Sequence, residues 1–163
     1  MMLRAIYKFS PAPPDSGPGL ARLTDLQWER VRRAWAEHMP ASRSRRRASD
    51  RQCFEGILWL LWTGAAWSEL PAEFGSASTC WRRLKAWSEQ GVLITLWRAY
   101  LAELDDQARV GWDVRLTRWD AELAPARHAH PDRNVERFGK EWLWSLSRVL
   151  RWELIAVRRD SPE

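Results

Sequence analysis

Hydrophobic positions along this chain recur mostly at intervals of three and four residues, which is the spacing of an amphipathic helix. Trp28, Val31 and Trp35 follow this spacing in the first such segment. Thr24 precedes the segment and Gln27 follows three residues later, which is the pattern of a capping box. We therefore predict a first helix that begins after Thr24 and ends near position 38.

A second helix is predicted over residues 49–63, with Ser49 as its N-terminal cap and Gly64 directly after its end. Apolar side chains cover much of its circumference, as expected of the central helix of a bundle. These are Cys53, Phe54, Ile57, Leu58, Leu60 and Leu61. The two cysteines of the chain, Cys53 and Cys80, form no CxxC motif, and we expect both to be buried free thiols.

The segment from Leu70 to Gly91 combines a short helix signal, a turn and a capped helix. The short helix is expected to end at Gly75, and Ser78 is the predicted N-terminal cap of the next helix. That helix has one apolar face and one face with hydroxyls and cations. The order is typical of a helix-turn-helix, whose second helix lies in a DNA groove. The alternative is a basic, solvated helix that packs on a bundle.

The residues predicted to contact DNA lie in two stretches. Those on the second helix of the motif are Ser78, Thr79, Arg82, Arg83 and Lys85. Those in the arginine-rich stretch 41–51 are Arg43, Arg45, Arg46, Arg47 and Arg51. The arginine-rich stretch could be a solvated charged loop, but the neighbouring motif favours phosphate contacts.

The remaining pattern predicts a mainly α fold, a small helical bundle containing the helix-turn-helix, with a poorly defined C-terminal tail. A helix is expected over residues 92–108, and its apolar face could serve a homo-oligomer, although core packing is the simpler explanation. A weak strand pattern ends at Asp120, a loop is expected over 124–134, and a last helix over 141–153 with Val149 on its apolar side. We divide the chain into a flexible arm (1–20), a DNA-binding domain (21–108) and the start of a catalytic domain or an irregular tail (109–163).

Composition agrees with a nucleic-acid partner but does not prove one. Lys and Arg outnumber Asp and Glu by 26 to 21, which gives a formal net charge of +5. The 13 Trp are best explained as core residues, and stacking on single-stranded bases is the alternative. No apolar run is long enough to span a bilayer and no secretory pattern opens the chain, so we expect a cytoplasmic protein without a membrane partner.

A series of short motifs between residues 23 and 92 resembles the N-terminal domain of transposases of the insertion sequence five family. In order, the motifs are Leu23-Thr24-Asp25, Trp28, Gly56-Ile57-Leu58-Trp59, Thr63-Gly64-Ala65, Trp67, Leu70-Pro71, Phe74-Gly75, Ser78-Thr79, Arg82-Arg83, Trp87 and Gly91-Val92. The resemblance implies a helical domain that binds double-stranded DNA at the terminal inverted repeats of a mobile element. A stand-alone helix-turn-helix transcriptional regulator is the alternative function.

In that family a ribonuclease H-like domain follows, in which an Asp-Asp-Glu triad holds two divalent metals. The resemblance makes Asp120 the one catalytic candidate, although Ala121 follows it where the family has Gly. We expect no complete triad, and so a DNA-binding fragment that is not catalytic alone. No cofactor and no metal site are expected for this chain, and Mg²⁺ only for a complete transposase.

Overall fold

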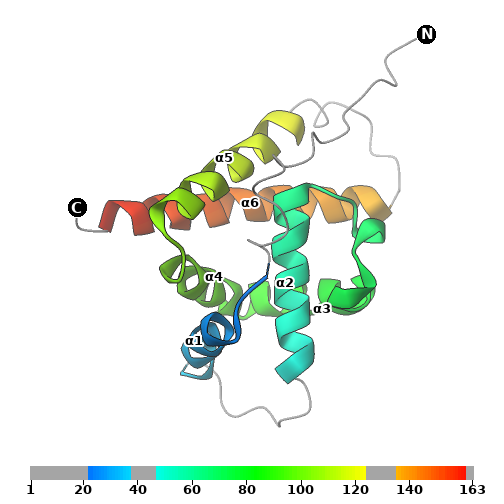
Figure 1. Ribbon diagram of the computed structural model, residues 1–163. Helices are drawn as coiled ribbons and strands as arrows, with labels where there is room; N and C mark the ends of the chain where they lie inside the picture. Colours follow the sequence, from blue (N-terminus) through cyan, green and yellow to red (C-terminus); the bar gives the residue numbers. More distant parts are fainter. Residues whose placement is uncertain (1–21, 38–46, 124–134, 161–163) are drawn as a thin grey trace.

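The computed structural model describes residues 22–37, 47–123 and 135–160. Within these ranges the chain forms six α-helices and two single turns of 3₁₀ helix, and no strand occurs in them (Figure 1). The elements are α1 (Asp25–Ala36), α2 (Arg47–Thr63), η4 (Trp67–Glu69), η5 (Ala72–Phe74), α3 (Ala77–Glu89), α4 (Val92–Ala102), α5 (Asp106–Leu123) and α6 (Val135–Asp160). The predicted mainly α fold class is confirmed.

The helices pack around α2, which contacts α3 and α5, and around α4, which contacts α1, α3 and α6. Figure 1 shows α5 and α6 on one side of the molecule and α1 and α3 on the other. None of the helices in the described ranges has an apolar stretch long enough to cross a membrane.

The ends of the first two helices follow the sequence signals closely, with one exception. The Thr24 hydroxyl accepts a hydrogen bond from the Gln27 amide at 3.2 Å, and the Gln27 side chain accepts one from the Thr24 amide at 2.9 Å, so the predicted capping box is confirmed. Gly64 ends α2 with φ 68° and donates to the Leu60 carbonyl, as predicted. Ser49 is not a cap, because α2 begins two residues earlier, at Arg47. Arginine and alanine are good helix formers, which suits this longer start.

The predicted strand before Asp120 is wrong, because residues 106–123 form α5. Trp112, Leu116 and Trp119 are buried at helical spacing, whereas Val114, which gave the impression of alternation, is 54% exposed. The last helix, α6, is longer than predicted, and Val149 lies on its solvent side at 49% exposed. The helix expected over 92–108 ends at residue 102.

The described part of the predicted tail therefore consists of regular helices rather than irregular chain. The expected arm (1–20) and the whole of the expected loop (124–134) lie outside the described residues, and the proposed division into domains stays a prediction.

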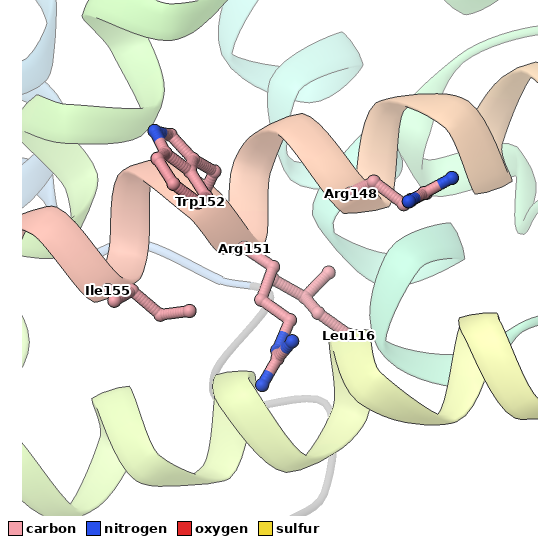
Figure 2. A pocket seen from close by; sticks show the side chains of 5 residues that line it. All are labelled: Leu116, Arg148, Arg151, Trp152 and Ile155. Atoms are coloured by element: carbon pink, nitrogen blue, oxygen red, sulfur yellow. The ribbon is translucent and has the colours of Figure 1, made fainter.

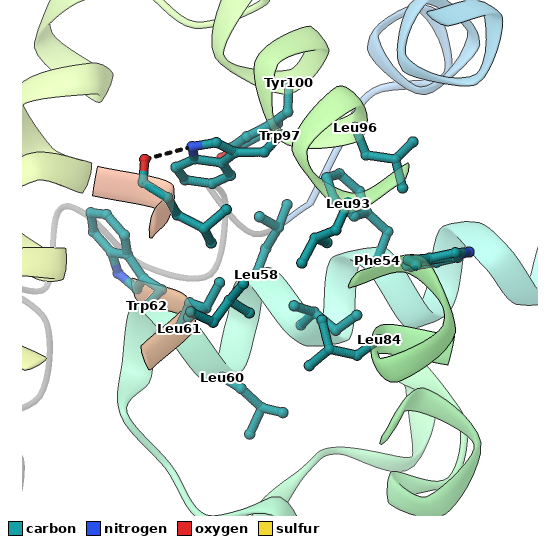
Figure 3. Close-up of a cluster of buried hydrophobic side chains, with 14 of the residues drawn as sticks. Phe54, Leu58, Leu60, Leu61, Trp62, Leu84, Leu93, Leu96, Trp97 and Tyr100 are labelled. Carbon is teal, nitrogen blue, oxygen red and sulfur yellow. Dashed lines mark hydrogen bonds between the residues drawn. The ribbon is translucent and has the colours of Figure 1, made fainter. Parts of the chain in front are cut away.

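Tryptophan side chains hold the C-terminal helices onto the rest of the core, as the packing interpretation predicts (Figure 3). The Trp97 indole N–H donates to the Leu150 carbonyl at 2.9 Å, which joins α4 to α6. The Trp119 N–H donates to the Leu61 carbonyl at 2.8 Å, which joins α5 to α2. Trp112 donates to the Tyr100 hydroxyl, and burial raises the pKa of Tyr100. Each of these indoles is buried with its polar atom satisfied, which keeps its burial favourable.

Candidate nucleic-acid interface

The candidate interface is built on α3, and its geometry starts at the turn before that helix. Gly75 has φ 90°, a left-handed conformation that favours glycine, and it ends η5. Ser76 then takes the extended backbone of an N-terminal cap, and its hydroxyl accepts a hydrogen bond from the Thr79 amide at 3.2 Å. The cap is therefore Ser76 and not Ser78 as predicted. Ser78 lies exposed in the first turn of α3.

The element that precedes this turn is shorter than the sequence pattern predicts. It is η5, a single 3₁₀ turn of three residues, so the nearest preceding α-helix is α2. Phe74 of η5 is buried beside α2, and the Cys80 thiol of α3 donates to the Phe74 carbonyl at 3.3 Å. A buried contact thus holds the turn to α3. The single turn η5 does not form the complete first helix that the motif requires.

The two faces of α3 differ as the helical wheel predicts. Cys80, Leu84 and Trp87 are buried at 0%, 0% and 4% exposed. On the other side Arg82 is exposed and the Lys85 side chain is 61% exposed. We define the α3 surface as Ser78, Thr79, Arg82 and Lys85.

The described polar contacts of the α3 surface lie within α3 or its cap. The Arg82 guanidinium donates to the Ser78 carbonyl one turn earlier at 3.4 Å, and Lys85 Nζ lies 4.0 Å from a Glu89 carboxylate oxygen. The Thr79 hydroxyl accepts a hydrogen bond from Ser76 at 2.8 Å. These exposed contacts are weak enough to exchange for contacts with a ligand.

Arg83 has a different environment from its neighbour Arg82. It forms an ion pair with Asp50 in the first turn of α2, and the two side chains are only 18% and 9% exposed. The Arg83 side chain therefore extends toward α2 and not toward solvent. The sequence pattern did not separate Arg82 from Arg83, because the partner carboxylate lies on another helix.

The other predicted arginines divide in a similar way. Arg51 contacts Asp25 at 2.7 Å and Glu55 at 3.1 Å, and it also donates to the Leu23 carbonyl. The hydrogen bond to Asp25 is the main cause that raises the pKa of Arg51. Arg51 therefore joins the start of α1 to α2.

For the remaining members of the arginine-rich stretch the structure gives only a position. Arg47 is the first residue of α2. Arg43, Arg45 and Arg46 lie outside the described residues. Their contact with DNA stays a prediction.

Both cysteines are buried free thiols, as predicted. A hydrogen bond with Cys53, together with burial, raises the pKa of the Cys80 thiol. This contact lies between α2 and α3 and belongs to the packing that supports the α3 surface. Both thiols lack the exposure of a reactive cysteine.

The described residues do not fit a two-metal catalytic site. Asp120 lies within α5, whereas the first carboxylate of a ribonuclease H-like domain was expected at the end of a strand. Among the described residues no three His, Cys, Asp or Glu side chains are grouped so that they could hold a metal ion. A catalytic role of Asp120 stays a prediction, and no catalytic step follows from this geometry.

A separate cavity of about 190 Å³ lies between α5 and α6 (Figure 2). It is lined by Leu116, Arg148, Arg151, Trp152 and Ile155. In Figure 2 Arg151 extends from α6 toward α5, where it pairs with Asp113 at 2.8 Å. Among the described residues that line it there is no carboxylate, thiol or imidazole, the usual general acids, bases and nucleophiles.

Comparison with known proteins identifies the family. Residues 23–97 match a family described as "Putative transposase of IS4/5 family". The chain is 48% identical over 58 residues to "Insertion element IS402 uncharacterized 16.2 kDa protein" of Burkholderia cepacia, which covers 34% of this chain and 40% of that protein. It is 31% identical over 110 residues to "Uncharacterized protein y4sN" of Sinorhizobium fredii, which covers 66% of this chain and 84% of that protein. No solved structure is significantly similar.

The α3 surface and the turn before it lie inside the matched region, as do α1, α2 and most of α4. The chain spans two fifths of the first of these relatives, so the activity of a whole transposase is not established by the match. The chain belongs to the IS4/5 family of transposases.

Proposed function

We propose that this protein is a DNA-binding part of a transposase and that it binds double-stranded DNA at the terminal inverted repeats of its insertion element. The observation that carries the proposal is the α3 surface. Arg82 and Lys85 are exposed there on the side opposite the buried Cys80, Leu84 and Trp87. Exposed cations on one face of a helix suit the phosphates of a duplex, and exposed hydroxyls add hydrogen bonds to phosphates or bases.

Because α3 is packed against the core, sequence-specific recognition of DNA is favoured over nonspecific electrostatic attraction. Its first turn is capped by Ser76, and its apolar side is packed against α2 and α4. A helix that is held rigidly can present side chains to base edges at fixed spacing, which a mobile basic tail cannot do. A DNA-binding role also places the protein in the cytoplasm, where bacterial DNA lies.

A titration of a terminal-repeat duplex and a scrambled duplex, at about 50 and about 200 mM salt, tests the proposal. Tighter binding to the repeat, retained at the higher salt, is expected. Equal binding to both duplexes that is lost at the higher salt would indicate a basic domain that binds DNA nonspecifically. Preference for DNA upstream of its own gene would instead indicate a transcriptional regulator.

Variants of single arginines test the surface itself. Arg82→Ala is expected to weaken binding and to reduce the slope of log K against log salt by about 0.9, the contribution of one phosphate contact. Arg118→Ala is the matched control, because Arg118 is exposed on α5, which Figure 1 shows well separated from α3. An equal loss in both variants would point to net charge as the cause.

A further inference from the structure

We infer that Asp50 and Arg83 are positioning residues for DNA binding: their buried ion pair fixes α3 against the first turn of α2, and Arg83 itself does not touch DNA. This inference rests on the proposed function. It changes the role of Arg83, which the sequence pattern assigned to direct contact, and it gives a role to Asp50, which the pattern did not single out.

Burial is the first observation behind the inference. The side chains of Arg83 and Asp50 are 18% and 9% exposed, whereas the side chain of Lys85, also on α3, is 61% exposed. A buried carboxylate is strongly disfavoured unless a cation or hydrogen-bond donors compensate it. The guanidinium of Arg83 is therefore held by Asp50, and turning it outward to a phosphate would separate it from this buried carboxylate.

The place of the pair in the fold is the second observation. Asp50 lies in the first turn of α2, close to Arg47, the first residue of that helix. Arg83 lies in the middle of α3, next to Arg82 on the α3 surface. The ion pair thus sets where the start of α2 lies relative to the exposed cations of α3. A duplex that met both would require this relative position to be fixed, since misplaced contacts lose affinity.

Other contacts also hold the same two helices together. Cys53 of α2 and Cys80 of α3 are both buried, the Cys80 thiol donates to the Phe74 carbonyl, and apolar side chains fill the rest of the contact. Apolar side chains can repack after a small shift of one helix along the other, whereas such a shift breaks an ion pair at hydrogen-bond distance. The pair therefore supplies the orientation that the apolar contact leaves open.

Direct contact of Arg83 with DNA and positioning of α3 by the ion pair predict opposite effects of Asp50→Asn on DNA binding. If Arg83 contacted DNA, removal of the nearby negative charge would leave binding unchanged or strengthen it. If the pair positions α3, the same change weakens binding to the repeat by about tenfold, within the range of couplings measured for contacting residues. Asp160→Asn is the matched control, because Asp160 is an exposed carboxylate at the end of α6.

Salt dependence gives an independent readout that separates a positioning residue from a residue that contacts a phosphate directly. Arg83→Gln is expected to weaken binding with an unchanged salt slope, whereas loss of a phosphate contact would lower the slope by about 0.9. Arg83→Lys keeps a cation beside Asp50 and should bind DNA more tightly than Arg83→Gln. The inference is overturned if Asp50→Asn binds at least as tightly as the wild type, or if Arg83→Gln lowers the slope as Arg82→Ala does.

Hydrogen exchange separates failure of this inference from failure of the proposed function. Without DNA, Asp50→Asn should speed amide exchange in α3 more than Asp160→Asn does, and equal exchange rates would overturn the positioning role. If wild-type protein binds no repeat duplex, the proposed function fails, and so does the inference that depends on it. If Asp50→Asn does not fold, the salt slopes of Arg83→Lys and Arg83→Gln decide between the two roles.

Discussion

Gly56→Ala should destabilise the protein, although alanine is the better helix former. Gly56 lies inside α2, where it is buried under η5. A Cβ added there would lie 2.9 Å from the Phe74 Cβ and 3.3 Å from a methyl carbon of Leu70. The Phe74 Cβ is bonded directly to its backbone, so it cannot move away unless η5 moves. Gly56 is therefore the residue that allows η5 to approach α2 closely.

The expected magnitude follows from two opposed terms. Overpacking of a filled core costs about 1–3 kcal/mol, and replacing glycine by alanine in a helix contributes about 1 kcal/mol in return. The net loss is about 1 kcal/mol if the cost has its middle value, which lowers the melting temperature of a chain of this size by about 2–4 °C. Because the start of α3 is joined to Phe74 through Cys80, binding to DNA should weaken as well.

Thermal or urea unfolding followed by circular dichroism measures the effect, with Gly111→Ala as the matched control. Gly111 lies in α5, and its added Cβ would be 3.3 Å from an outer ring carbon of Trp62, a less severe contact than the one of 2.9 Å at Gly56. Gly111→Ala should be neutral or slightly stabilising. The close approach of η5 to α2 would be refuted if Gly56→Ala were as stable as Gly111→Ala.

Three further changes test separate parts of the structure. Thr24→Ala removes the cap of α1 and should cost about 1 kcal/mol in urea unfolding, and no loss would argue against the capping box. Trp97→Phe removes the 2.9 Å hydrogen bond from the indole to the Leu150 carbonyl and leaves part of a buried site empty, so it should cost about 1–3 kcal/mol, while an unchanged stability would contradict this contact between α4 and α6. The thiols of Cys53 and Cys80 are buried, and their mutual hydrogen bond raises the pKa of Cys80, so a thiol reagent at neutral pH should modify them only after unfolding; rapid modification of the native protein would contradict this burial.

Helix positions and the buried faces could be predicted from the sequence because both depend on local spacing. Thr24 and Gln27 cap a helix by contacts within four residues, and Gly64 and Gly91 take left-handed conformations directly after helices. The strand prediction before Asp120 failed because the short alternation around Val114 overlapped a helical pattern that included two tryptophans. A longer stretch of sequence has to be considered before the spacing of a helix can be distinguished from the alternation of a strand.

Which arginines are exposed and which form ion pairs within the fold could not be predicted, because this depends on partners far away in the chain. Arg82 and Arg83 are adjacent in sequence, and only the packing of α2 on α3 brings Asp50 to Arg83. Arg51 likewise belongs to an ion-pair cluster with Asp25 of α1. Ser76 could have been identified as the cap, since it directly follows a glycine that ends the preceding turn.

A photo-crosslinking amino acid placed at position 82, and in a second protein at position 118, tests most directly whether the α3 surface meets DNA. Both positions are exposed, one on α3 and one on α5. With the terminal-repeat duplex, irradiation should join the DNA to position 82 and not to position 118, and unlabelled repeat should compete better than a scrambled duplex. Crosslinking from position 118 alone, or from neither position while the repeat is bound, would contradict the assignment of the α3 surface to DNA recognition.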